Sequence, residues 1–402
     1  MLKGKNIILG VTGGIAVYKA ADLVSRLKKQ NANVEVIMTD AAMEFVNPLT
    51  FQTMSNNPVH TSMFNKIDKF DVEHISLAKK ADMILVAPAT ANTIAKVAHG
   101  FADNLLTTVI MASHAKIVFA PAMNTEMYNN PIQQENMNKL KKLGYGFIQP
   151  GVGLLACGDY GAGKMAEPAD IVEYVIDAFV EKDLKGKKIV ITAGPTIEPL
   201  DPVRYITNHS SGKMGYLLGK EAKSRGAEVV IISGPTSLEA PKGVQVVHVN
   251  TTQEMFDAVG EHFDSCDILI KSAAPADYRP ENISSTKIKK KDNKEDELNI
   301  KFVRNPDIAL HYGNKKNKQI VIGFAAETDN LVEYAKNKLE KKNFDFIVAN
   351  DVTKEGAGFK SDTNIVTIID NKGEIESYPI MTKSKLSKTI LDKAYLILKN
   401  KS

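Results

Sequence analysis

The chain has 402 residues, of which 44% are hydrophobic and 24% charged, and its formal net charge at pH 7 is +4. This is the profile of a soluble globular protein, and the length predicts two or three domains. The two cysteines, Cys157 and Cys266, exclude a disulfide framework and favour a reducing, cytoplasmic compartment. We expect no membrane partner, because no apolar run reaches the length of a membrane span, and no nucleic-acid partner, because no recognisable binding motif is present.

Predicted strands and helices alternate in the first part of the chain. GKNIILGVTGG (4–14) is a short apolar strand that ends in a glycine turn, and a helical pattern follows it. NANVEVIMTD (31–40), ADMILVAPA (81–89) and KIVF (116–119) are further apolar strands. Continuous apolar strands that alternate with helices indicate a parallel sheet covered by helices on both faces.

The same order of elements begins again in the second part of the chain. Three segments resemble the first three predicted strands, because each is a short apolar run that leads into a loop: GKKIVITAGPT (186–196), RGAEVVIISG (225–234) and CDILIKSAAPAD (266–277). The sequence therefore predicts an α/β protein with two Rossmann-like domains, in which ligands lie at the carboxyl ends of the strands.

The segment 180–188 is polar and rich in lysine, as domain boundaries often are. We place the boundary there and predict domains over residues 1–185 and 186–402. The second domain is expected to have a parallel-rich sheet.

The first glycine turn, GVTGGIAVYKA (10–20), suits a phosphate group, because backbone amides and the helix dipole attract anions at the start of a helix. It does not have the G-x-G-x-x-G pattern of dinucleotide-binding domains. Asp40 follows the second strand, where an NAD enzyme would hold a ribose. A tight turn needed only for packing explains these glycines equally well, so the turn alone leaves the ligand open.

Polar loops follow the later strands of the first half. They are APATANTIAKVAHGFADNLLTT (87–108), APAMNTEMYNNP (120–131), VEHISLAKKAD (72–82) and the glycine-rich LLACGDYGAGKMAEP (154–168). Together these motifs resemble those of the flavin-dependent cysteine decarboxylases. The likeness is closest to the decarboxylase half of the bifunctional phosphopantothenoylcysteine decarboxylase/phosphopantothenate–cysteine ligases of bacterial coenzyme A synthesis, and it spans about residues 4–180.

The resemblance implies a bound FMN and a defined set of residues. The FMN-binding residues would be Gly13, Gly14, Ile15, Ala16, Thr39, Thr90, Ala91, Asn92 and Asp103. His74 of EHISL would be the catalytic histidine, and Asn124 of PAMN would bind the substrate carboxylate. Cys157, in a segment that extends to Met165, would belong to a clamp over the substrate. Family members form trimers of this domain.

The chemistry of the reaction explains these residue types. Direct loss of CO₂ from a cysteine carboxylate would leave an unstabilised carbanion, whereas prior oxidation of the thiol to a thioaldehyde provides an electron sink. FMN would accept the hydride, which no side chain can do. His74 is a suitable base for the substrate thiol near neutral pH. We expect Cys157 to return a proton to the decarboxylated enethiolate, from a loop whose glycines let it move.

Each of these residues has an ordinary explanation when it is taken singly. His74 could be a surface or core histidine, Asn124 could cap a helix, and Cys157 could be an inert thiol. Their occurrence together, in the order of the family, favours the functional interpretation. Three other histidines match no family motif and are given no role: His60, His99 and His114.

The second half contains a segment that looks at first like a phosphate-binding P-loop, ITAGPTIEPLDPVRYITNHSSGKMGYLLGKEA (191–222). Thr207 replaces the required glycine and Met214 replaces the required Ser or Thr, so the P-loop pattern fails. The small residues Gly215, Gly219 and Ala222 instead suit a helix that packs closely on a sheet, with its N-terminus toward a ligand.

Several motifs of this half resemble the ligase half of the same bifunctional family. They are ITNHSSGKMG (206–215), SAAPADYRP (272–280), KIKK (287–290), NPDI (305–308), GFAAET (323–328) and VANDV (348–352). The resemblance covers about residues 186–395 and implies a CTP-dependent ligase. The carboxylate of 4′-phosphopantothenate would attack the α-phosphate of CTP, and the amine of cysteine would then displace CMP from the acyl-cytidylate.

The same resemblance implies roles for individual residues. Asn208 would contact the acyl intermediate, and Lys287 would be a catalytic lysine on an exposed flap. The CTP-binding residues would be Ala273, Asp277, Lys287, Asn305, Pro306, Asp307, Ile308, Phe324, Lys338 and Lys342. Lysines and Mg²⁺ suit a triphosphate that is attacked by a carboxylate, and Asp277 is the candidate metal ligand.

Two other classes of protein remain open on the residues alone. One is a different flavin- or NAD-linked Rossmann enzyme with a fused nucleotide-binding domain, and the other is a non-enzymatic oligomeric regulator. The combination of His74, Asn124 and Cys157 argues against the regulator, because a pure binding module does not need all three. By analogy with the family we expect a homo-oligomer, in which trimeric decarboxylase and dimeric ligase contacts would form a closed dodecamer.

Overall fold

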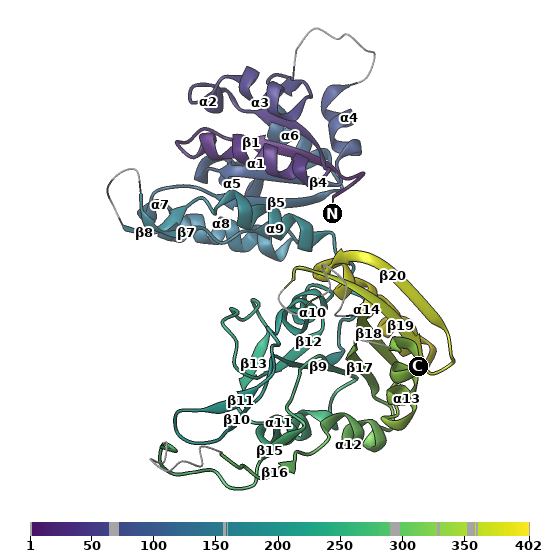
Figure 1. Cartoon of the computed structure of the whole chain (residues 1–402). Coiled ribbons are helices and arrows are strands. Elements are labelled where there is room, and N and C mark those ends of the chain that lie inside the picture. Colours follow the sequence, from purple (N-terminus) through teal and green to yellow (C-terminus); the bar gives the residue numbers. More distant parts are fainter. Residues whose placement is uncertain are drawn as a thin grey trace. The chain divides into compact units, whose positions relative to one another are not determined.

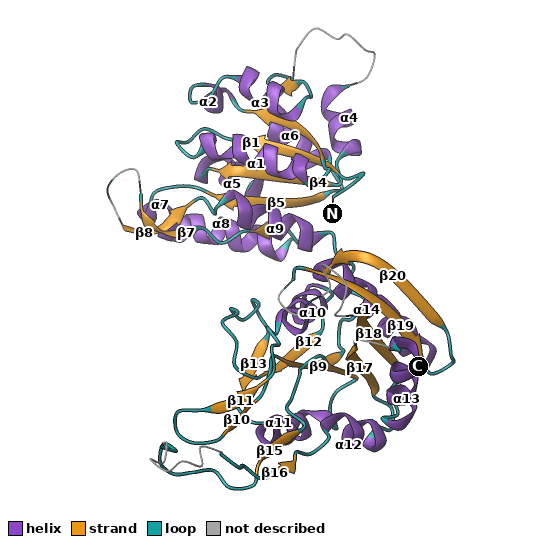
Figure 2. Ribbon diagram, viewed as in Figure 1, coloured by secondary structure: helices purple, strands orange, loops and turns teal. Residues whose placement is uncertain are grey.

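The computed structural model describes residues 2–63, 72–155, 158, 160–289, 298–327, 330–351, 358 and 361–401. It divides into two compact units, Met1–Phe179 and Val180–Ser402. Each unit has its own sheet with helices packed on it (Figures 1 and 2).

The first unit contains a parallel sheet in the order β3-β2-β1-β4-β5-β6. Its strands are β1 (Asn6–Val11), β2 (Asn33–Met38), β3 (Val59–His60), β4 (Met83–Ala89), β5 (Lys116–Pro121) and β6 (Gly146–Phe147). Its helices are α1 (Val17–Lys29), α2 (Asp40–Met43), α3 (Pro48–Ser55), α4 (Glu73–Lys80), α5 (Ala91–Ala98), α6 (Leu105–Ala112), α7 (Thr125–Asn129), α8 (Pro131–Lys142) and α9 (Pro168–Ala178). A separate antiparallel hairpin joins β7 (Gly151–Leu154) to β8 (Tyr160–Lys164).

Alternate residues of the central strand β1 enter two hydrophobic cores. Leu9 packs in a cluster with Leu23 of α1 and Ile171 of α9. Ile8, on the opposite face, packs in a cluster with Ile94 of α5 and residues of α6. A strand that is buried on both faces has no polar side, so its sequence is a continuous apolar run.

The second unit contains a mixed sheet in the order β13-β12-β9-β14-β17-β18-β19-β20. The pairs β18–β19 and β19–β20 are antiparallel, and the other neighbouring pairs are parallel. Its strands are β9 (Lys188–Ala193), β12 (Glu228–Ser233), β13 (Gln245–His248), β14 (Ile268–Lys271), β17 (Ile320–Glu327), β18 (Phe346–Asp351), β19 (Thr363–Asp370) and β20 (Ile375–Thr382). Two small antiparallel hairpins, β10 (Ile197–Pro199) with β11 (Tyr205–Thr207) and β15 (Tyr278–Pro280) with β16 (Phe302–Arg304), extend from it.

Helices cover both faces of the second sheet. On one face, α10 (Lys213–Ser224) and α14 (Lys383–Lys401) share a core with β9 and β14. The other face is covered by α11 (Thr252–Phe263), α12 (Ile308–Lys315) and α13 (Leu331–Lys341). In each sheet the strand order reverses beside the first strand, between β1 and β4 and between β9 and β14, which is where ligands bind in doubly wound folds.

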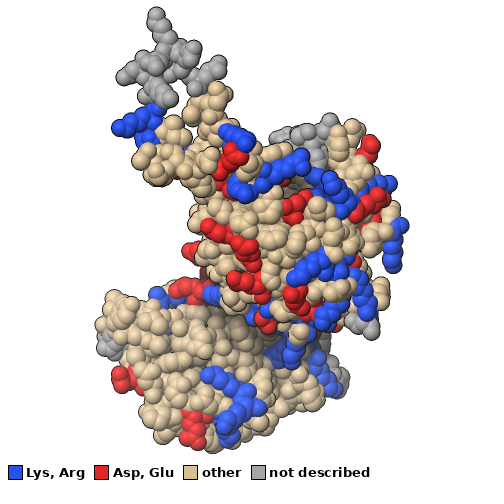
Figure 3. All heavy atoms as spheres, turned by 90° about the horizontal axis from the view of Figure 1, so that it is seen from below, with Lys and Arg blue, Asp and Glu red and all other residues tan. Residues whose placement is uncertain are grey.

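The predicted fold class, two Rossmann-like α/β domains with a parallel-rich second sheet, is confirmed. Cys266 is buried just before β14, as expected of a core residue. Within the part of the chain that the structure describes, no helix is both long enough and apolar enough to cross a membrane. On the face drawn in Figure 3, basic and acidic side chains are interspersed among uncharged ones, in keeping with the small net charge.

Candidate active sites

In the first unit, the glycine turn after β1 approaches the start of the next strand-end loop closely. A Cβ atom on Gly13 would lie 2.4 Å from Cβ of Ala41 and 2.7 Å from its backbone carbonyl oxygen, so this position accepts only glycine. Gly14 faces open space, since the nearest atom to a Cβ there would be 3.9 Å away on Thr90. The turn is therefore closely packed at Gly13, whereas its backbone is accessible at Gly14.

The loops after β1 and β4 are joined at the point where the strand order reverses. Thr12 Oγ1 donates to the carbonyl oxygen of Pro88 at 2.7 Å and accepts from the amide of Thr90 at 3.0 Å. Thr90 in turn caps α5, whose first residues are Ala91 and Asn92. The free amides at this helix start and the open glycine turn form a cradle with the chemistry that a phosphate group needs.

Two further predicted FMN residues lie at this edge of the sheet. Thr39 follows β2 as the N-cap of α2, and its amide donates to the carbonyl oxygen of Val11 at 3.1 Å. Asp103 is exposed, and the ammonium of Lys96 at 2.5 Å holds its carboxyl pKa below the usual value. The predicted FMN residues therefore lie on loops after β1, β2 and β4, and this donor set fits a flavin nucleotide.

The loop after β5 and the β7–β8 hairpin contact each other directly. Asn124 caps α7, since its Oδ1 accepts from the amide of Glu126 at 2.8 Å. The preceding residue, Met123, donates from its amide to the carbonyl oxygen of Gly163 on β8 at 3.0 Å. Cys157 lies outside the described residues, but both strands of its hairpin are described, and β8 packs against the Asn124 loop.

Gly163 makes this contact possible. It has φ +137°, a conformation that other residues rarely adopt, and a Cβ there would lie 2.3 Å from the carbonyl oxygen of Met123. We predict that Gly163→Val displaces the Asn124 loop and lowers decarboxylation by about 10²-fold, because small misplacements of binding groups are costly. Product formation from 4′-phospho-N-pantothenoylcysteine measures this loss.

Gly153 on the other strand of the hairpin provides the matched control. A Cβ at Gly153 would meet no atom within 4 Å, so Gly153→Val should keep nearly full decarboxylation. The ligase reaction that the resemblance implies for the second half should be unaffected in both variants. Wild-type decarboxylation by Gly163→Val would show that the hairpin contact is not needed.

His74 is the second residue of α4 and is half-buried. The preceding residue, Glu73, forms a hydrogen bond with His60 of β3, in which Glu73 Oε1 lies 2.5 Å from His60 Nδ1. His60 Nε2 lies 3.3 Å from Oε2 of Glu35, which also bonds Lys80 at the end of α4. A partly buried charge cluster therefore connects the helix of His74 to β2 and β3.

The charges of this cluster stabilise one another. The hydrogen bond from His60 is the largest cause that lowers the pKa of Glu35 to about 2, against the effect of burial, and Lys80 adds to it. Burial opposes protonation of His60, but the hydrogen bonds to Glu35 and Glu73 outweigh it and raise its pKa. No role for His60 was predictable from the sequence. The available signal was the glutamate in the otherwise apolar strand NVEVIM.

We predict that Glu35→Gln destabilises the first unit in a pH-dependent way. A carboxyl pKa lowered from 4.5 to about 2 stabilises the fold above pH 4.5, and this stabilisation is lost as the pH falls toward 2. The shift corresponds to about 3 kcal/mol at neutral pH. Thermal unfolding of variant and wild type should therefore differ most near pH 6 and clearly less at pH 3, with convergence only near pH 2.

An exposed acid in the same unit serves as the control for this experiment. Glu44→Gln should unfold like the wild type at both pH values, because Glu44 is exposed. The raised pKa of His60 acts in the opposite sense, since its contribution is complete below pH 6.5 and is lost as the pH rises through the folded value. An equal loss of stability for Glu35→Gln at pH 6 and pH 3 would contradict the assignment.

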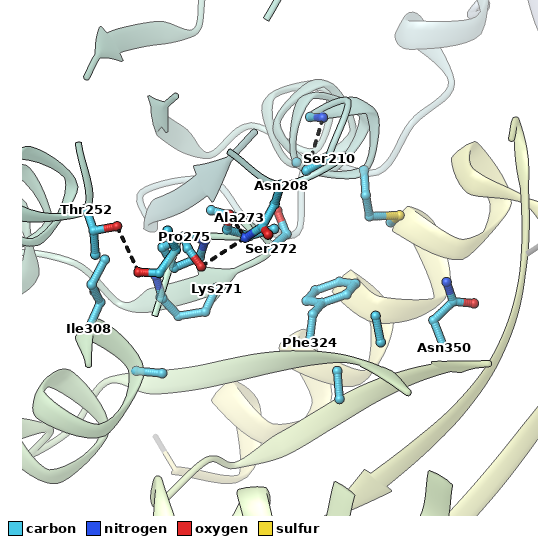
Figure 4. A pocket seen from close by; sticks show the side chains of 18 of the residues that line it. Asn208, Ser210, Thr252, Lys271, Ser272, Ala273, Pro275, Ile308, Phe324 and Asn350 are labelled. Carbon is cyan, nitrogen blue, oxygen red and sulfur yellow. Dashed lines mark hydrogen bonds between the residues drawn. The ribbon is translucent and has the colours of Figure 1, made fainter. Parts of the chain in front are cut away.

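The second unit contains a cavity of about 390 Å³ at the carboxyl ends of its central strands (Figure 4). It is lined by Asn208 and by all the residues predicted to bind CTP except Lys287: Ala273, Asp277, Asn305, Pro306, Asp307, Ile308, Phe324, Lys338 and Lys342. The structure thus brings together residues that lie more than 100 positions apart in the sequence.

Two asparagines hold the loop over residues 273–277 in this cavity. Asn208 Nδ2 donates to the carbonyl oxygens of Ala274 at 3.0 Å and Pro275 at 3.2 Å. Asn305 Nδ2 donates to the carbonyl oxygen of Ala276 at 2.9 Å, and its backbone amide donates to that of Asp277 at the same distance. The backbone of the loop is thereby fixed, and Asn208 is held at the cavity wall.

Several lysine side chains line the cavity. Lys342 forms an ion pair with Asp307 at 3.1 Å, and Asp307 also caps α12. Lys271, the last residue of β14, lines the cavity although it is only 6% exposed. Lys271 is not among the site residues predicted from the sequence. The signal in the sequence is a lysine at the end of the apolar strand ILIK.

Lys287 lies outside the cavity and is exposed. The backbone of the next residue, Ile288, is held by two hydrogen bonds. Its amide donates to Asp201 Oδ2 at 3.1 Å, and its carbonyl oxygen accepts from Arg204 at 2.8 Å. The part of the predicted flap from residue 290 to 297 lies outside the described residues.

The described residues contain no group of three or more His, Cys, Asp or Glu side chains that could hold a metal ion. Asp277 is an exposed carboxylate that lines the cavity. Mg²⁺ is commonly held by one or two carboxylates together with substrate phosphates, so Asp277 fits a metal that enters with a nucleotide.

Two Rossmann-like units, one with a phosphate-type cradle and one with a lysine-lined cavity, define a two-domain enzyme with separate sites. Family models agree with this division. The Flavoprotein family matches residues 1–180, and the DNA/pantothenate metabolism flavoprotein C-terminal domain matches residues 184–397.

Curated relatives extend over nearly the whole chain. The Coenzyme A biosynthesis bifunctional protein CoaBC of Bacillus subtilis is 48% identical over 97% of both chains. The protein of the same name from Escherichia coli is 45% identical, also over 97% of both chains. The chain belongs to this family of coenzyme A biosynthesis bifunctional proteins.

Solved structures match single halves. The C-terminal domain of a CoaBC protein is 42% identical over 55% of this chain and 100% of its own, with a TM-score of 0.47. A variant of PPC decarboxylase complexed with pantothenoylaminoethenethiol is 35% identical over 43% of this chain and 96% of its own, with a TM-score of 0.39.

Family membership confirms the predicted class of enzyme. The chain is a bifunctional enzyme of coenzyme A biosynthesis, with a flavoprotein decarboxylase half and a ligase half. A flavin cofactor therefore belongs to the first half. The roles of individual residues and the boundary at residue 185 remain predictions.

Proposed function

We propose that the second half joins cysteine to 4′-phosphopantothenate at the expense of CTP, and that the first half, with FMN, decarboxylates the product to 4′-phosphopantetheine. The observation that supports the ligase reaction is the single cavity lined by Asn208 and nearly all the predicted CTP residues. The phosphate-type cradle and the contact between the Asn124 loop and the hairpin support the decarboxylase reaction.

The ligase reaction has two steps. The carboxylate of 4′-phosphopantothenate attacks the α-phosphorus of CTP, and pyrophosphate leaves with the electrons of the broken P–O bond. The amine of cysteine then attacks the acyl carbon, CMP leaves, and the amine loses a proton. A carboxylate is a poor acyl donor until it carries such a leaving group.

Residues of the cavity suit these two steps. Lys338 and Lys342 would neutralise the phosphates, and Asp277 would hold the Mg²⁺ that accompanies CTP. Asn208 lies against the loop that would face the acyl group. Lys287 reaches the phosphates only when its segment moves toward the cavity, as flaps of nucleotide-dependent enzymes do.

FMN supplies two-electron exchange with the substrate when it is bound in the first half. The residues that would hold it are those of the glycine turn, Thr39, the segment 90–92 and Asp103. Asn124 binds the substrate carboxylate, His74 takes the proton of the substrate thiol, and Cys157 returns a proton to the product. The charge cluster of His60 keeps the helix of His74 in place.

We further propose that the chain is a cytoplasmic homo-oligomer. Decarboxylase halves would assemble as trimers and ligase halves as dimers, which together form a dodecamer. The molar mass of the purified protein in solution tests this arrangement.

Incubation without cysteine tests the proposed ligase chemistry. With 4′-phosphopantothenate, CTP and Mg²⁺ the protein should release pyrophosphate and hold an acyl-cytidylate that mass spectrometry detects. Addition of cysteine should then release CMP. Amide formation in the absence of any nucleotide, or release of inorganic phosphate in place of pyrophosphate, would contradict the proposal.

A further inference from the structure

Lys271 occupies the position in the second sheet where the strand order reverses. It ends β14, and its register partners are Thr192 on β9 and Gly323 on β17. Side chains alternate along a strand, so Lys271 lies on the same face as Leu269, whose cluster includes Ile308 at the start of α12. A lysine thus projects into the covered face of the sheet and lines the nucleotide cavity (Figure 4).

Few polar groups face the ammonium of Lys271. Among the described residues, its one hydrogen bond is to Thr192 Oγ1 at 3.4 Å. Asp307 of α12 is the carboxylate that faces it, but Asp307 is already paired with Lys342 at the end of α13, which repels Lys271. Gly323 of β17 brings no side chain, so no carboxylate of the described residues pairs with Lys271 alone.

The protonation state of Lys271 follows from these surroundings. Burial is the largest cause that lowers its pKa, to about 7, the positive charge of Lys342 lowers it further, and Asp307 acts in the opposite direction. A charged amine that is fully buried loses its hydration, so the neutral form is favoured unless an anion replaces the water. Asp307, the carboxylate that faces Lys271, is shared with Lys342.

The phosphate groups of a nucleotide are anions of the required kind. We propose that Lys271 is a further nucleotide-binding residue of this cavity and that it takes up a proton when the phosphates of CTP enter. This inference rests on the proposed function of the ligase half. Above neutral pH the free site holds a neutral amine and the complex holds an ammonium, so CTP binding consumes a proton.

The proton uptake has a definite effect on affinity. If one proton is bound with CTP, the association constant falls about tenfold for each pH unit above the pKa of the free amine. The affinity should therefore decrease between pH 8 and pH 9, where the phosphates of CTP are already fully ionised.

Isothermal titration calorimetry of the full-length protein with CTP and Mg²⁺ measures this uptake directly. At pH 8, titrations in buffers of different ionisation enthalpy should give an uptake of about one proton by the wild type. Lys271→Met should reduce the uptake to near zero and make affinity nearly independent of pH. Lys271→Arg should also bind without uptake, because a guanidinium is already charged.

An exposed lysine provides the control, since Lys372 lies in the turn between β19 and β20 and Lys372→Met should retain the uptake. Tight CTP binding by the wild type without proton uptake would overturn the assignment to Lys271. Equal uptake by the wild type and Lys271→Met would also overturn it. A complete lack of CTP binding by the wild type would contradict the proposed function itself.

Discussion

The variant His74→Asn is expected to bind its flavin normally. The substrate should no longer reduce that flavin at an appreciable rate. A general base contributes about 10²–10⁴-fold to a proton transfer, so flavin reduction by 4′-phospho-N-pantothenoylcysteine should slow by at least that range. Asparagine has a similar polar shape but no basic nitrogen, and the position at the second residue of α4 is only half-buried, so the fold should tolerate it.

Anaerobic mixing with substrate separates a role in catalysis from a role in flavin binding. The wild type should lose its yellow absorbance, and His74→Asn should remain yellow over the same period. His99→Asn, at an exposed helix end in the same unit, should bleach like the wild type. Rapid bleaching of His74→Asn would refute the assignment of the base.

Lys287→Gln and Asn208→Asp are expected to block different steps of the ligase reaction. A cation that faces developing phosphate charge contributes about 10²–10³-fold to the rate, so Lys287→Gln should suppress pyrophosphate release by that factor. Asn208→Asp removes the amide that donates to Ala274 and Pro275 and places a negative charge beside the acyl group. The second step should suffer most, and acyl-cytidylate should accumulate.

Pyrophosphate and acyl-cytidylate are measured together in each variant. Lys289→Gln is the matched control, because Lys289 is exposed like Lys287 and lies two positions away. It should show wild-type pyrophosphate release. If Lys287→Gln and Asn208→Asp lose the same step to the same extent, the division of roles between them is wrong.

Among the strands of the two sheets, β1, β2, β4, β5, β9, β12 and β14 were predictable, because they are apolar runs in the buried middle of each sheet. The runs around Ile8 and Ile191 have no polar side, and each is followed by a glycine turn at the edge where ligands bind. The antiparallel strands β19 and β20 were not predicted. Polar residues occur along both, so neither is a continuous apolar run like the central strands.

The motif residues of the second half were predictable as a set, whereas pairings across the fold were not. Asn208 and Asn305 meet at the same loop only because separate strand ends converge on one cavity. His60 was overlooked because its partners Glu35 and Glu73 are distant in sequence or belong to another element. A single polar residue in an apolar pattern does not reveal which charge it meets.

The burial of Lys271 was also not predictable from the local sequence. Its sequence context is a strand, and a lysine at a strand end is usually solvated. Its burial depends on α12 and α13, which pack over that end of β14 from later parts of the chain. Lys287 was selected by its motif, but the motif contains no information on its distance from the cavity.

The most direct test of the complete account is one incubation of the purified chain with 4′-phosphopantothenate, CTP, Mg²⁺ and cysteine labelled with ¹³C in the carboxyl group. Mass spectrometry should find unlabelled 4′-phosphopantetheine, with one CMP, one pyrophosphate and one labelled CO₂ for each product molecule. Labelled 4′-phospho-N-pantothenoylcysteine that persists as the end product, or product formation without CTP, would contradict the succession of a CTP-dependent ligase and a flavin-dependent decarboxylase in one chain.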